Sequence, residues 1–107
     1  MLYKFKSKAA GDLILLEPQG RQILSILGKE PGPQGIIEPI EMLPAIEALH
    51  AAVAREEAAH VQACQDALAR AEAPPPRPAI GLRQRVVPFV DMLQRAHAQD
   101  VSVVWGV

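Results

Sequence analysis

The sequence predicts an α+β fold, in which a small three-stranded sheet is packed by about three helices in the order ββαααβ. Both ends of the chain carry short apolar stretches, and the first and last alternate at the period of a strand with one buried face. The long middle segment instead repeats its apolar residues at helical spacing. Because 107 residues is the length of one domain, we expect 1–107 to form a single α+β domain.

The N-terminal residues predict a β-hairpin. In residues 1–6, Tyr3 and Phe5 point to one side of a strand and the two lysines point to the other. The Gly-Asp pair at 11–12 predicts the turn. Residues 13–16 are wholly apolar, which is typical of a strand buried on both faces.

A first helix and a loop follow the hairpin. Pro18 predicts the helix start, because a first turn does not need the N–H that proline lacks. Apolar residues between Ile23 and Leu27 share one face, and Gly28 is placed to end the helix in the left-handed conformation. Residues 28–35 are rich in proline and glycine and predict a loop.

A long helix is predicted from Pro44, because no proline or glycine follows until Pro74. One face of this helix carries Ile46, Leu49 and Val53, then Glu57 and His60, then Cys64 and Leu68. The polar interruption of the apolar stripe indicates that the helix extends past the edge of the domain rather than bending.

The chain closes with a connector, a helix and a strand. Four prolines in 73–80 predict a stiff, extended internal connector. Apolar residues from Leu82 to Leu93 recur at helical spacing, and Pro88 is expected to kink that helix or to lie in the first turn of its longer half. Residues 101–105 predict the last strand.

In the predicted sheet, one face is the buried one and the other is partly apolar. The buried face carries Tyr3, Phe5, Val103 and Trp105, and the second face carries Leu2, Ile14, Leu16 and Val104 beside its lysines. We expect the long helix or a second copy of the chain to cover the second face.

Charge argues for an ordinary soluble chain. The formal net charge is −1, which argues against nucleic-acid binding. The charge is uneven, at +3 over residues 1–29, −6 over 30–73 and +2 over 74–107, so we expect intramolecular attraction or a partner that meets the acidic helix.

Cysteine usage and hydropathy predict a cytoplasmic protein. Cys64 stands alone, which rules out an internal disulfide and favours a reducing compartment. No apolar run is long enough for a signal peptide or a membrane span, so we expect no membrane partner.

The sharpest candidate for a site is a metal site on the long helix. Glu57, His60 and Cys64 are spaced by three and four residues, so they project from one side of the helix as metal ligands do. The alternative is a half-exposed helical face with a small apolar cysteine. No catalytic or cofactor motif is present.

The two ends of the chain resemble a known family. The first reads MLYKFKSKAAGDLILLEPQGRQILSILGK and the second LRQRVVPFVDMLQRAHAQDVSVVWGV. They are similar to short proteobacterial proteins described as domain of unknown function 1840. The resemblance implies a stand-alone bacterial cytosolic protein and transfers no activity, cofactor or site residue.

The sequence thus favours a non-enzymatic protein-interaction module, with a protein partner or a homodimer at the long helix or the half-apolar sheet face. A metal-binding or small-molecule-binding protein that uses the long helix is the second hypothesis. An enzyme of unrecognised type is the third.

Overall fold

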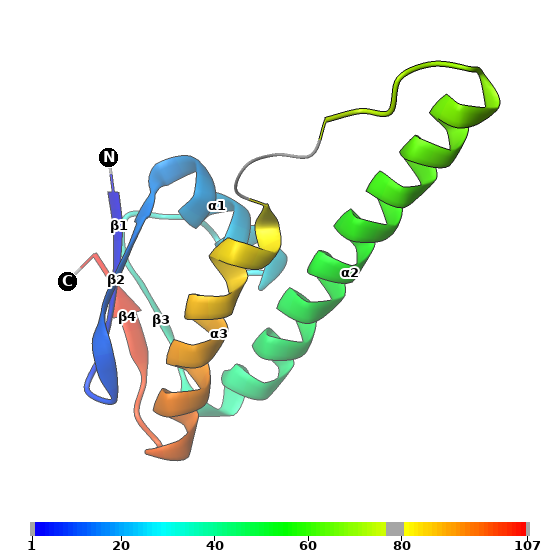
Figure 1. Cartoon of the computed structure of the whole chain (residues 1–107). Helices are drawn as coiled ribbons and strands as arrows, with labels where there is room; N and C mark the ends of the chain where they lie inside the picture. The colour runs from blue at the N-terminus through cyan, green and yellow to red at the C-terminus, as the bar shows by residue number, and fades with distance from the viewer. Residues whose placement is uncertain (1, 77–80, 107) are drawn as a thin grey trace.

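A computed structural model gives the fold and describes residues 2–76 and 81–106. Its sheet has four strands, β1 (Leu2–Ser7), β2 (Ala10–Leu16), β3 (Gly35–Ile37) and β4 (Val103–Trp105). Its helices are α1 (Glu17–Ile26), α2 (Pro39–Ala69) and α3 (Leu82–Ala98). The fold is therefore α+β, as predicted, but the element order is ββαβααβ (Figure 1).

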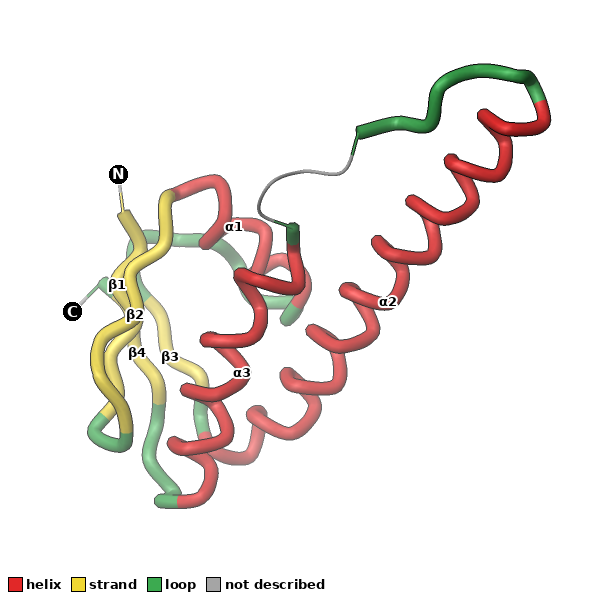
Figure 2. Tube along the Cα trace, viewed as in Figure 1, coloured by secondary structure: helices red, strands yellow, loops and turns green. Residues whose placement is uncertain are grey.

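The sheet is antiparallel throughout, in the order β2-β1-β4-β3. The prediction of three strands was wrong, because Ile36 and Ile37 pair with β4 as a fourth strand. The predicted neighbours at the two ends of the chain do meet, since Phe5 lies opposite Trp105. The N-terminal and C-terminal strands thus form the centre of the sheet (Figure 2).

The first hairpin turns earlier than predicted. Residues 8–9 form the turn, and the Gly-Asp pair at 11–12 lies inside β2. β2 is also an edge strand. It is not buried on both faces as predicted, because Ile14 and Leu16 are exposed. A run of apolar residues does not reveal whether a strand has one neighbour or two.

The helices lie on one face of the sheet, and it is the face that the sequence predicts to be buried. Tyr3, Phe5, Val103 and Trp105 point into the core, and each is at least 95% buried. They meet a fully buried set from the other elements, which includes Ile23, Leu24, Ile37, Met42, Leu49, Phe89 and Leu93. The core therefore joins all three helices to the sheet.

The loop before β3 is tied to the sheet by two aromatic side chains. The Tyr3 hydroxyl donates a hydrogen bond to the carbonyl oxygen of Pro31 at 2.9 Å. The indole Nε1 of Trp105 donates to the carbonyl oxygen of Gly32 at 3.2 Å. Both rings thereby bury their apolar area while satisfying their polar atoms.

Helix α2 begins at Pro39, five residues before the predicted start. The Glu41 carboxylate accepts a hydrogen bond from the Glu38 N–H at 3.3 Å, as in a capping box, and Pro39 suits the first turn. Met42 is fully buried, which favours extending the helix back past Pro44. Pro44 itself is exposed inside the helix.

The remaining connections follow the sequence closely. Residues 73–76 of the predicted connector are exposed and belong to no helix or strand, while 77–80 lie outside the residues that the structure describes. Helix α3 starts at Leu82 and runs through Pro88. None of the described helices combines the length and the apolar character that crossing a membrane requires.

All three helices end in the same way. The residue after each C-terminal cap adopts a left-handed conformation, with φ of 76° at Gly28, 54° at Ala71 and 55° at Asp100. The two hydrogen bonds of a Schellman motif follow in each case, as in the pair Lys29 N to Leu24 O and Gly28 N to Ser25 O. The sequence predicted this end only for α1.

These ends give a paired prediction of stability. We expect Gly28→Ala to lower the free energy of unfolding by about 1 kcal/mol, because a Cβ is strained in the left-handed region. Asp100→Gly removes that strain at the end of α3, and we expect a gain of about 0.5 kcal/mol. Urea unfolding checks both, and changes of the same sign in the two variants would contradict the prediction.

Candidate functional site

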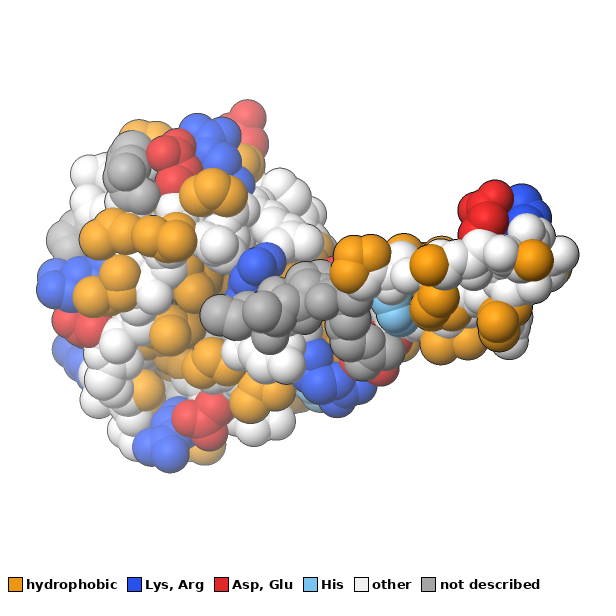
Figure 3. Space-filling view, turned by 45° about the horizontal axis from the view of Figure 1, so that its top comes forward, with side chains coloured by type: hydrophobic (Ala, Val, Ile, Leu, Met, Phe, Trp, Pro, Cys, Tyr) orange, Lys and Arg blue, Asp and Glu red, His pale blue; other side chains and the backbone are white. Residues whose placement is uncertain are grey.

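The second half of α2 extends beyond the body of the molecule. The buried residues of this 31-residue helix all lie between Met42 and Val53, with Ala67 as the exception. At 1.5 Å per residue the helix is about 46 Å long, so residues 54–69 form an arm of about 24 Å. Figure 3 shows this arm projecting from the body with hydrophobic side chains along it. The predicted overhang of the helix is confirmed.

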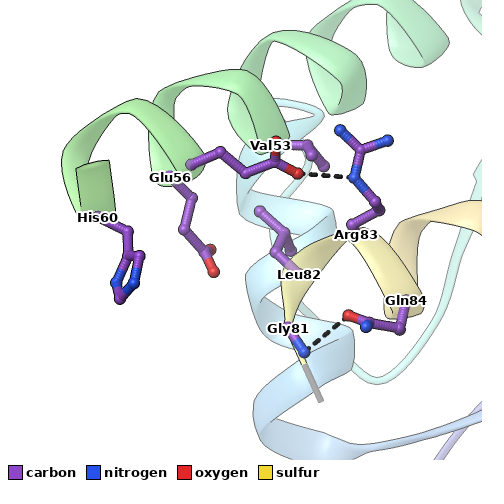
Figure 4. Close-up of a pocket in the computed structure, with 8 residues that line it drawn as sticks. Val53, Glu56, His60, Gly81, Leu82, Arg83 and Gln84 are labelled. Carbon is purple, nitrogen blue, oxygen red and sulfur yellow. Dashed lines mark hydrogen bonds and ion pairs between the residues drawn. The ribbon is translucent and has the colours of Figure 1, made fainter. Parts of the chain in front are cut away.

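A groove lies where the arm leaves the body and α3 begins. It has a volume of about 340 Å³, and Val53 and Leu82 provide its apolar lining. Figure 4 shows Glu56 and His60 on the α2 side of the groove and Gly81, Leu82 and Gln84 at the start of α3 on the other side. That turn is held by a capping hydrogen bond of 2.8 Å from the Gly81 N–H to Gln84 Oε1.

An ion pair between Glu57 and Arg83 forms the wall of the groove. The two side chains meet at 2.6 Å and connect α2 to α3 (Figure 4). Glu57 raises the pKa of Arg83, first through the hydrogen bond and then through its charge. Both side chains are about half exposed, so this pair positions the helices more than it stabilises them.

On the other side of this pair a second hollow of about 560 Å³ continues between the two helices. It is lined by Ala54, Val86, Val87 and Val90 among apolar residues, and by His50, Asp91 and Gln94 among polar ones. The two hollows share Val53, Glu57 and Arg83. Together they make a discontinuous groove along the junction of α2 and α3.

The three residues predicted to bind a metal are only partly brought together. His60 Nε2 lies 3.5 Å from Cys64 Sγ, whereas Glu57 pairs with Arg83. Within residues 2–76 and 81–106, no three His, Cys, Asp or Glu side chains are grouped so that they could hold a metal ion. Metal binding by Glu57, His60 and Cys64 stays a prediction, which a zinc titration checks.

The side of α2 opposite its buried residues is exposed along its whole length. Nine exposed positions recur on it at intervals of three or four residues, and we call them the outer stripe. They are Ile40, Leu43, Glu47, Ala51, Ala54, Ala58, Val61, Gln65 and Leu68. Among the larger apolar members, Ile40 is 84% exposed and Leu68 is 72% exposed. Glu47 is the one charged member.

The outer stripe was missed by the sequence analysis, although a signal was available. Helical spacing places Leu68 near Val61, seven residues before it, as well as on the face that continues Ile46 and Val53, and both Val61 and Leu68 are exposed. Reading both apolar stripes of the helix would have found it. A helix that is apolar on two sides is typically covered on both.

The sheet has an open face opposite the helices. Leu2, Ile14, Leu16 and Ile36 are 44–59% exposed on it. The expectation that the long helix covers this face was wrong, because α2 lies on the other side of the sheet (Figure 1). Lys4 also lies there and pairs with Asp12 at 3.4 Å.

Another ion pair fixes the start of α2. Lys29 binds Glu41, and the hydrogen bond from Lys29 is the largest cause of the lowered pKa of the Glu41 carboxyl. Glu41 also completes the capping box with Glu38. The loop before β3 is thus joined to α2 as well as to the sheet.

The fold and these surfaces define a small α+β protein that has helices on one face of an antiparallel sheet and one helix projecting as an arm. The chain belongs to the family described as Domain of unknown function (DUF1840), whose model matches residues 1–105. The family resemblance seen in the sequence is thereby confirmed. Comparison with curated proteins and with solved structures gives no match.

Proposed function

We propose that the chain is a non-enzymatic protein-interaction module, and that the outer stripe of α2 binds a helix of a partner protein. The outer stripe carries this proposal. It offers about 46 Å of exposed, mainly apolar helix surface at the spacing that a second helix needs to pack against it. Surfaces of this kind on soluble proteins are typically interaction sites.

Charge supports a partner of defined chemistry. Helix α2 contains five acidic residues against Arg55 as its one arginine or lysine. Glu47 lies in the outer stripe, whereas Glu41 and Glu57 already pair with Lys29 and Arg83 and Glu56 lines the groove beside α3. A partner helix with leucine or isoleucine on one side and a lysine or arginine opposite Glu47 complements this surface. Such an interface weakens with salt because Glu47 is exposed.

The experiment is a comparison of captured partners. Tagged wild-type protein, expressed in cells of its source, is compared with the double variant Val61→Glu, Leu68→Glu. We expect the variant to lose the partner and keep its melting temperature, because both side chains are at least half exposed. The matched control is Val87→Glu, which changes a valine of α3 that is 59% exposed, and it should keep the partner.

Equal capture by the wild type and the double variant would contradict the proposal. Loss of the same partner in Val87→Glu would also count against it and would move the interface to the groove between α2 and α3.

A further inference from the structure

Strand β2 is apolar on both faces and yet lies at the edge of the sheet. Leu13 and Leu15 are half-buried on the helix side, while Ile14 is 55% exposed and Leu16 is 59% exposed on the open face. Among the strands that the structure describes, β2 is hydrogen-bonded to β1 alone. In Figure 1 it is the strand nearest the viewer, with no segment in front of it. Its composition is typical of a central strand, although it lies at the edge of the sheet.

The edge has few of the features that keep sheet edges apart. Residues 10–16 contain no lysine and no proline, which are the residues that most often protect an edge strand. Asp12 is the one charge of β2, and Lys4 of the neighbouring strand pairs with it at 3.4 Å. A second strand that approaches residues 10–16 therefore meets one charge, and that charge is already paired within the chain.

The exposed apolar area gathers at this same edge. Leu2 lies opposite Leu16 in the register of β1 and β2, and Leu2 is 57% exposed. Leu2, Ile14 and Leu16 therefore form one apolar corner of the open face. At the other edge of the sheet, β3 is only three residues long.

We infer that β2 pairs with β2 of a second copy, antiparallel about a two-fold axis perpendicular to the sheet, to form an eight-stranded sheet. The strand is self-complementary in such a pair. Residues opposite each other in antiparallel strands share a face. With the two-fold axis at Ile14, Leu13 of each copy lies opposite Leu15 of the other on the helix side, and the two Ile14 side chains meet on the open face. Because Lys4 compensates Asp12 in each copy, no uncompensated like charges are brought together.

The expected affinity is moderate. Seven residues of strand span about 23 Å, and this is short for the ~800 Å² that a stable interface buries on each partner. The dimer should therefore exchange with monomer at micromolar to millimolar concentration. It is independent of the helix partner proposed for the outer stripe.

The first test is sedimentation velocity over a concentration series, with the wild type and two matched variants. Ile14→Glu places a carboxylate at the edge but opposite Lys4, so the monomer tolerates it. We expect it to weaken dimerisation about tenfold or more, because it replaces an apolar side chain in each copy by a carboxylate and brings two like charges to the interface. Ile36→Glu makes the same change on the same open face, at the far edge strand, and should dimerise as the wild type does.

The second test is hydrogen exchange on the wild type, which needs no variant to fold. The amides of residues 10–16 that point away from β1 should exchange more slowly as concentration rises, while those of residues 35–37 should not change. A strict monomer at millimolar concentration overturns the inference. Equal weakening of dimerisation by Ile14→Glu and Ile36→Glu also overturns it, because that result indicates that the open faces stack. Weakening by the double variant Val61→Glu, Leu68→Glu alone overturns it as well, because that result assigns self-association to α2.

Discussion

Replacing Gly35 by alanine is expected to lower the free energy of unfolding by about 3 kcal/mol. A Cβ built on Gly35 overlaps the indole ring of Trp105, which lies directly opposite in β4. The ring has no room to move, because it is 2% exposed and its Nε1 is hydrogen-bonded to Gly32. The strain must therefore separate β3 from β4 or displace Trp105 from the core.

Gly32→Ala is the matched control for this change. It lies in the same segment, its Cβ meets nothing closer than 3.9 Å, and its carbonyl still accepts the bond from Trp105. We expect its unfolding free energy to stay within about 0.5 kcal/mol of the wild type in urea titrations followed by circular dichroism. Similar losses in the two variants would show that backbone entropy, and not the contact with Trp105, is responsible.

The second large effect is expected for Phe5→Ala. Phe5 is fully buried at the centre of the aromatic cluster, with its ring centroid 4.9 Å from Phe89 in an edge-to-face arrangement and 5.8 Å from Trp105. Removing the ring deletes contacts from both layers and leaves a cavity, so we expect a loss of about 3–5 kcal/mol. That is much of the stability of a typical domain.

Two further variants show whether the loss is due to the cavity. Phe5→Leu keeps part of the volume and should lose less than Phe5→Ala. Leu2→Ala removes an apolar side chain from the same strand on the open face, where Leu2 is 57% exposed, and should cost less than about 1 kcal/mol. An equal loss in Phe5→Ala and Leu2→Ala would contradict the position of the core.

The local patterns that were predicted correctly are those in which side-chain direction follows from the backbone period alone. The alternation around Tyr3 and Phe5 identified the buried face of β1, and Gly28 identified the end of α1. The polar residues after Val53 indicated that α2 leaves the body there. Each of these features requires only neighbouring residues.

The candidate site depended on contacts that local spacing does not contain. Helical spacing placed Glu57, His60 and Cys64 along one side of α2, but it did not reveal that Arg83 binds Glu57 across 26 residues of sequence. It also did not separate the buried residues of α2 from the outer stripe, because both sets are mainly apolar. Only the position of α3 identifies which stripe is covered.

By itself, the sequence determined the α+β class, the pairing of its two ends in one sheet and the faces that enter the core, because side chains at strand or helix spacing sort themselves by hydrophobic burial. The tertiary structure alone decided the strand order, the addition of β3 and the edge position of β2. The strand order and the edge positions depend on which strands pair with each other. That outcome is set by backbone hydrogen bonds between segments far apart in the chain, and a local pattern of side chains does not specify them.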